Sequence, residues 1–252
     1  MFTIRGEQIK VFEQHAKKRF EIETVLHIAE FSPRQFEILG EETIRQIIGS
    51  GLERAEGYGF TNRGPARFYV ELMFMLGSDF DTDPQYPWAA ELLRGHVQTG
   101  QMNRADQLYQ KTMQYIEAVA GQNLEFERDA LNRVVGPVAL PFSGKDAGDI
   151  PPFFKKIYPQ KCEFLGDAVL EEIVRLGVSV AGAYSRSSKA SLLFTGLIFI
   201  FGHGCLTDQQ FPWIANTLAA GAPGEEDKKI ERLYSKTRSY LDNALIELER
   251  RM

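Results

Sequence analysis

The chain has little cysteine and no long apolar run. Only Cys162 and Cys205 occur among 252 residues, which argues against a disulfide-stapled fold. The longest apolar stretch, residues 192–201, is about half as long as a bilayer-spanning helix. Charged residues within the first ten positions leave no apolar core for a signal peptide. We therefore expect a cytoplasmic protein with no membrane-spanning segment.

The chain also lacks an excess of positive charge. It carries 29 Lys and Arg against 34 Asp and Glu, which gives a net charge of −5. Non-specific nucleic-acid binding needs a concentrated basic surface that displaces counterions, so nucleic acid is not an expected partner. Alternating strand patterns are nearly absent, and apolar residues recur instead at helical spacing. The predicted fold class is therefore all-α.

No sequence motif for catalysis is present. The sequence has no glycine-rich phosphate loop, no nucleophile elbow and no HExxH. His15, His27, His96 and His203 are scattered, whereas zinc sites need clustered ligands. We therefore predict no catalytic residues, no cofactor and no metal site, and an enzyme is the less favoured interpretation.

What the chain does contain is an internal repeat. Many residues between positions 72 and 115 recur in order about 125 positions later. The identical pairs are Leu72 and Leu197, Phe74 and Phe199, Gly77 and Gly202, Thr82 and Thr207, Asp83 and Asp208, Pro87 and Pro212, Trp88 and Trp213, Leu108 and Leu233, Lys111 and Lys236, and Tyr115 and Tyr240. Such self-similarity predicts a tandem duplication of a helical unit of about 95 residues, giving two similar packed lobes.

The repeat divides the chain into three predicted segments. Residues 1–125 form a first helical unit with an N-terminal helix, and residues 126–152 form a connecting helix and a Gly/Pro linker. Residues 153–252 form the second helical unit. Gly77 and Gly202 suit left-handed caps at the ends of two apolar helices.

The sequence also places helices near the N-terminus. Apolar residues at helical spacing predict a long helix over residues 7–30. Ser32 and Pro33 predict the start of a short helix that Gly40 closes. A further helix is expected over residues 41–57.

The repeat also gives an interpretation of the two cysteines. Cys162 aligns with Phe36 and Cys205 aligns with Phe80. A cysteine at a phenylalanine position is most simply a small buried hydrophobe. A catalytic pair of Cys205 with His203 is disfavoured, because the aligned positions of the first unit carry no matching chemistry.

Three aspartates alternate in the first unit. Asp79, Asp81 and Asp83 are spaced as at the opening of a calcium-binding loop. The glycine and glutamate that such a loop requires are replaced by Pro84 and Ala90, so calcium is disfavoured.

Only the third of these aspartates recurs, as Asp208. We interpret Asp83 and Asp208 as structural anchors that cap the N-termini of helices. Asp79 and Asp81 occur in the first unit alone and form an acidic turn that is a candidate partner-binding site.

Each unit carries one tryptophan directly after a proline. Pro87 and Pro212 suit the first turn of a helix. Trp88 and Trp213 could stack on a ligand, but their recurrence beside proline favours a structural anchor in the core.

The most polar repeated string is Leu-Tyr-x-Lys-Thr-x-x-Tyr. Tyr115 and Tyr240 share a helical face with apolar neighbours and are predicted structural anchors. Lys111 and Lys236 lie beside that face, so they are candidate partner-binding residues.

The first unit also carries a pattern that resembles a known group of proteins. The pattern comprises Ile4, Arg5, Glu7, Gln8, Phe12, Arg19, Phe20, Tyr58, Gly59, Leu72, Met73, Phe74, Gly77, Phe80, Asp83, Pro84, Pro87 and Trp88. It resembles small helical proteins of uncharacterised function encoded beside toxins in Gram-negative type VI secretion gene clusters. The resemblance covers about the first 95 residues, implies a toxin, effector or secretion component as partner, and offers no catalytic residues.

These observations favour a non-enzymatic protein-binding module. The expected role is an adaptor, a chaperone-like protein or an immunity-type partner of a secreted toxin or effector. Two alternatives stay open. One is an enzyme or small-molecule binder with its site between the two units, and the other is a self-assembling structural subunit.

Overall fold

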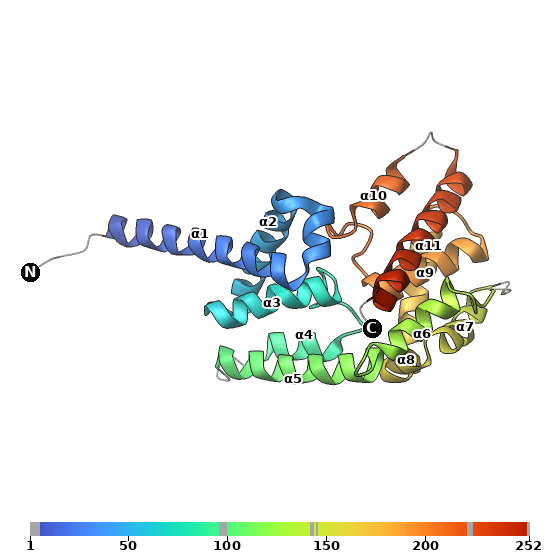
Figure 1. The fold of residues 1–252 in the computed structure, drawn as a ribbon, viewed down its shortest axis with the longest axis horizontal. Coiled ribbons are helices and arrows are strands. Elements are labelled where there is room, and N and C mark those ends of the chain that lie inside the picture. The colour runs from blue at the N-terminus through green and yellow to red at the C-terminus, as the bar shows by residue number, and fades with distance from the viewer. Residues whose placement is uncertain (1–5, 96–99, 142–143, 145, 221–223, 251–252) are drawn as a thin grey trace, which may run out of the picture.

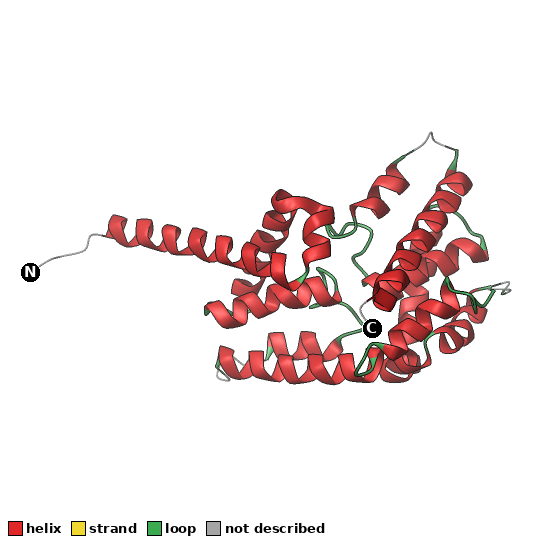
Figure 2. Ribbon diagram, viewed as in Figure 1, coloured by secondary structure: helices red, strands yellow, loops and turns green. Residues whose placement is uncertain are grey.

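The fold is all-helical, as the sequence predicts. The computed structural model describes residues 6–95, 100–141, 144, 146–220 and 224–250. Over these ranges the chain forms eleven α-helices and no strand, and the helices are joined by loops and turns (Figure 2). None of these helices combines the length with the apolar character that crossing a bilayer requires.

The first helices follow the expected order. They are α1 (Gly6–Phe31), α2 (Pro33–Gly57), α3 (Arg63–Leu76), α4 (Pro87–Arg94), α5 (Gln101–Ala120) and α6 (Glu125–Val134). Gly40 interrupts α2 with φ 75° and ψ 157°, which lie outside the helical region. The helix that the sequence closes at Gly40 and the helix over residues 41–57 are therefore two arms of α2.

The later helices repeat these lengths closely. A 3₁₀ turn (Ala147–Asp149) precedes α7 (Ile150–Ile157), α8 (Pro159–Ala181), α9 (Ser188–Phe201), α10 (Pro212–Ala219) and α11 (Glu226–Arg250). Both α3 and α9 have 14 residues, and both α4 and α10 have 8. Gly166 interrupts α8 with φ 74° and ψ 166°, nearly the values found in α2. Since α7 starts inside the predicted linker 126–152, part of that segment is helical.

The buried apolar side chains fall into two clusters. The N-terminal core draws on residues 25–119, and the C-terminal core draws on residues 135–245. The helix α5 packs against α8, and α6 packs against both α5 and α11, so the two cores share an interface. In Figure 1 the helices α2 to α5 lie on one side of the molecule and α7 to α11 on the other.

One helix departs from this packing. The N-terminal half of α1 projects beyond the body of the molecule (Figure 1). Its C-terminal half packs on α2 and α3 and buries Thr24, Val25 and Ile28. The ion pair of Lys17 with Glu56 marks where α1 first meets the N-terminal core.

Candidate functional site

The two cores meet at the C-terminal ends of α3 and α9. Gly77 and Gly202 end these helices at φ 100° and φ 90°, where an L side chain is strained. A Cβ atom on Gly77 would lie 2.8 Å from the carbonyl oxygen of Phe201, and one on Gly202 would lie 3.4 Å from that of Leu76. Glycine therefore allows the two helix ends to approach each other.

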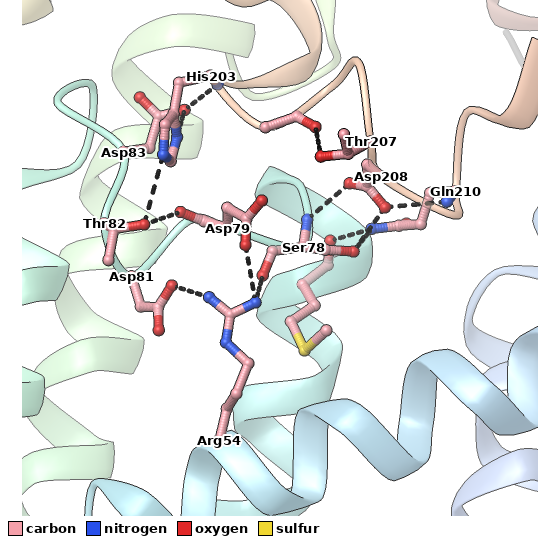
Figure 3. Close-up of polar contacts among 12 residues, drawn as sticks. Arg54, Ser78, Asp79, Asp81, Thr82, Asp83, His203, Thr207, Asp208 and Gln210 are labelled. Carbon is pink, nitrogen blue, oxygen red and sulfur yellow. Dashed lines mark hydrogen bonds and ion pairs between the residues drawn. The ribbon is translucent and has the colours of Figure 1, made fainter. Parts of the chain in front are cut away.

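An aspartate from each side binds the backbone just beyond the opposite helix. Asp83 Oδ2 accepts a hydrogen bond of 2.7 Å from the His203 amide, and Asp208 Oδ2 accepts one of 2.9 Å from the Ser78 amide (Figure 3). Asp208 Oδ1 also accepts from the Ser78 hydroxyl at 2.7 Å. Both carboxylates are buried, so these bonds are made away from water.

A glutamine from each side completes the exchange. The side-chain amide of Gln85 donates to the Ile198 carbonyl at 2.9 Å, and that of Gln210 donates to the Met73 carbonyl at 2.7 Å. These carbonyls belong to the last turns of α9 and α3, and each also accepts the amide of the glycine that ends its helix, so the glutamine is its second donor. We call this set of residues the junction: Gly77, Ser78, Asp83, Gln85, Gly202, His203, Asp208 and Gln210.

The junction corrects the interpretation of the two aspartates as helix caps. The residue that precedes α4 is Tyr86 and the one that precedes α10 is Phe211, and neither helix has a side-chain cap. Asp83 and Asp208 instead join the two cores. They remain structural anchors, but they connect the two cores and do not cap a helix.

The glutamines were missed at the sequence level. Gln85 and Gln210 lie 125 positions apart, as do the other repeated pairs (210 − 85 = 125). The recurrence of a polar residue at this spacing is the sequence signal that could have found them. Both side chains are buried in the structure, where a polar side chain needs hydrogen-bond partners.

The acidic turn of the first half faces inward. Arg54 Nη1 donates to Asp79 Oδ1 at 2.9 Å and to the Ser78 carbonyl at 2.7 Å, and its Nη2 pairs with Asp81 (Figure 3). The Tyr69 hydroxyl donates to Asp81 at 2.7 Å. Asp81 is buried, whereas Asp79 is half-exposed. Of the two candidate residues, only Asp79 therefore reaches the surface.

The two candidate lysines lie elsewhere. Lys111 on α5 and Lys236 on α11 are exposed. Within the described part of the chain, neither forms an ion pair, and neither joins the Arg54 cluster. The structure does not bring the four candidate partner-binding residues into one site.

His203 adds a titratable group to the junction. Its Nδ1 lies 3.3 Å from Asp83 Oδ2, and the side chain is partly exposed. The hydrogen bond and charge of Asp83 raise the pKa of His203, although burial opposes that rise. The aligned residue on the other side is Ser78, so the junction has one ionisable histidine.

Aromatic side chains pack beside the junction in both cores. Tyr115 meets Tyr86 edge to face at 5.3 Å, and Tyr240 stacks on Trp213 at 5.5 Å. Trp88 lies edge-on to Tyr86 at 6.1 Å. Both tryptophans are half-buried, and Pro87 and Pro212 begin α4 and α10 as expected.

The cysteines are buried as the repeat predicts. Both Cys162 and Cys205 are free thiols. Burial raises the pKa of Cys162 to about 11 and that of Cys205 to about 12. Both are therefore protonated at neutral pH. Among the described residues, no three His, Cys, Asp or Glu side chains gather in an arrangement that could hold a metal ion.

The fold and the junction define a class of all-helical protein in which two cores exchange side-chain hydrogen bonds. Comparison of the chain with protein-family models, curated proteins and solved structures gives no match.

Proposed function

We propose that this chain is a non-enzymatic protein-binding module that docks its partner on α1. The observation that carries the proposal is a row of exposed apolar side chains on that helix. We call this row the α1 stripe; its members are Val11, Phe12, Ile22 and Leu26.

The stripe occupies one side of α1. Val11 and Ile22 are three helical turns apart, and Leu26 lies one turn beyond Ile22. Phe12 is 67% exposed and Leu26 is 63% exposed. Thr24 and Ile28 lie on the opposite side of the helix and are buried. The stripe therefore faces away from the protein's own core.

A projecting helix with exposed apolar side chains is unfavourable in free energy unless another surface packs on it. Helices shorter than about 15 residues are marginal in water unless packing supports them. A contiguous exposed apolar surface is typical of an interaction site. A partner with an apolar groove would cover the stripe in the helix-in-groove mode. Lys18 lies beside the stripe and favours an acidic group on the rim of that groove, whereas Arg19 is paired with Glu23 on α1 itself.

The partner class follows from the sequence resemblance. Phe12, Arg19 and Phe20 belong to the pattern shared with proteins of toxin and secretion gene clusters, and all three lie on α1. We therefore propose a toxin, effector or secretion component as partner and a cytoplasmic location for the encounter. The role would be that of an adaptor, a chaperone-like protein or an immunity protein.

We further propose that the chain arose by tandem duplication into two lobes. Support comes from the equal lengths of α3 and α9 and of α4 and α10. The reciprocal bonds of the junction, in which aligned residues play matching parts, also support it. On this view the α1 stripe belongs to the first lobe alone.

The test compares partner capture by stripe variants from the native host. A tagged unmodified chain should retain one stoichiometric partner, and the double variant Phe12→Glu, Leu26→Glu should lose it. Met102→Glu is the matched control, because Met102 is 54% exposed on α5 and lies outside the stripe. Equal capture by both variants would refute the proposal. Light scattering that shows a dimer, lost only in the double variant, would instead assign the stripe to a second copy.

A further inference from the structure

A large cavity lies between the two cores, away from α1, and reaches Leu76 and Tyr86 beside the junction. Its volume is about 820 Å³, which falls within the usual range for ligand pockets. Helices α5, α6, α7, α9 and α11 and the start of α8 contribute to its wall. Most lining side chains are aliphatic or aromatic, among them Leu131, Val134, Phe154, Leu193, Phe199 and Leu241.

A buried lysine faces this apolar space. Lys161 is only 5% exposed. Its Nζ donates to the Phe199 carbonyl at 2.5 Å and lies 4.7 Å from the centroid of the Phe199 ring. An ammonium has three donors, and no carboxylate of the described residues lies within ion-pair distance of this one. A buried charge without a counterion is costly, so the cavity favours an anionic group near Lys161.

Two further charged side chains line the cavity, Glu127 on α6 and Arg238 on α11. Glu127 lies on the same wall as Lys161 but does not form an ion pair with it. Burial raises the pKa of the Glu127 carboxyl, and the charge of Lys161 opposes part of that rise. The cavity wall therefore carries two cations, Lys161 and Arg238, against the single carboxyl of Glu127, and this balance favours an anionic group in the cavity.

We propose that this cavity binds a single-chain amphiphile with a carboxylate headgroup. The headgroup pairs with the Lys161 ammonium, whose hydrogen bond to the Phe199 carbonyl leaves two donors for it. The alkyl chain lies along the aliphatic wall formed by residues such as Leu131, Leu193 and Leu241. An alkylamine would place a further positive charge beside Lys161.

The first test uses the unmodified protein and calorimetric titration with alkyl carboxylates, below their micelle concentrations. The association constant should rise roughly fourfold for each methylene added, because each buried methylene contributes about 0.8 kcal/mol. Dodecanoate should bind more tightly than dodecanol, and dodecanol more tightly than dodecylamine. No binding by any of these probes, or tightest binding by the amine, would overturn the proposal.

The second test removes the proposed headgroup partner. Lys161→Met should weaken dodecanoate binding about tenfold or more, since a hydrogen-bonded charge is lost, and should leave dodecanol binding nearly unchanged. Lys156→Met is the matched control, because Lys156 is an exposed lysine on α7. Equal weakening of dodecanoate binding by both variants would overturn the assignment to Lys161. The stripe variants of α1 should bind dodecanoate normally, so failure of either proposal can be recognised separately.

Discussion

On both sides of the junction a buried aspartate accepts the amide that follows a helix-ending glycine, and a buried glutamine donates into the last turn of the opposite helix. Asp83 and Gln85 do this for α9, and Asp208 and Gln210 do it for α3. The four bond lengths differ by no more than 0.2 Å, between 2.7 and 2.9 Å. These two matched pairs, of aspartates and of glutamines, therefore help to hold the two cores together.

The sides differ around the acidic turn. Asp79 aligns with Gly204, and a Cβ on Gly204 would collide with the Asp79 carboxylate. Arg54, which binds the Asp79 carboxylate, aligns with Val180. The Asp79 carboxylate thus occupies the space that a side chain at position 204 would need, so close packing accounts for this difference between the two sides.

The largest expected losses of stability come from the two tryptophans. Trp213 stacks on Tyr240 and meets Phe201 edge-on, whereas Trp88 contacts, among the rings of the described residues, that of Tyr86. Trp213→Ala should lower the free energy of unfolding by about 4 kcal/mol and Trp88→Ala by about 3 kcal/mol. Urea denaturation measures both. Unchanged stability in either variant would show that the tryptophan is not a core anchor.

The next comparison uses two glycines on equivalent helices. A Cβ on Gly177 would lie 2.6 Å from the Thr195 backbone nitrogen, whereas one on Gly51 would meet the flexible sulfur of Met73 at 2.6 Å. Gly177→Ala should cost about 3 kcal/mol through overpacking of α8 on α9, and Gly51→Ala less than about 1 kcal/mol. Thermal unfolding measures both losses of stability. Equal losses in Gly177→Ala and Gly51→Ala would contradict the prediction.

The junction aspartates should come third. Asp83→Ala leaves the buried amides of His203 and Gln85 without their acceptor, which should cost about 2 kcal/mol. Asp208→Ala should cost nearly as much, because it frees the amides of Ser78 and Gln210. Chemical denaturation should show both losses. If Asp83→Ala lost stability and Asp208→Ala did not, the two aspartates would not contribute equally to the stability of the junction.

The smallest effect concerns pH. Asp83 raises the pKa of His203, so the interaction of the two side chains stabilises the fold fully below about pH 6.5, the ordinary histidine pKa. This stabilisation is lost as pH rises through the raised pKa of His203. Because the pair is partly exposed, the loss should be about 0.5 kcal/mol. His203→Ser, which copies the residue of the other side, should remove this dependence. Urea denaturation below about pH 6.5 and above the raised pKa of His203 measures this change in the free energy of unfolding. Identical pH profiles for the unmodified chain and for His203→Ser would contradict the prediction.

Helix boundaries were largely predictable from glycine and proline. Pro33, Pro87 and Pro212 begin helices, and Gly40 interrupts one, because their backbone preferences act locally. The burial of Cys205 followed from its alignment with Phe80, since both aligned positions are buried.

The junction and the cavity could not be predicted in this way. Asp83 and His203 are 120 positions apart, and nothing local indicates that they meet. The cavity wall combines Leu131 and Leu241 from helices far apart in sequence. Periodicity identifies the inward side of each helix, but not which other helix it meets.

The most direct test of the central claim is photocrosslinking from the α1 stripe in the native host. Benzoylphenylalanine placed at Phe12 should yield one discrete adduct with a partner protein. The same group at Met102 should yield none. No adduct from Phe12, or the same adduct from both positions, would contradict the claim that α1 docks a partner.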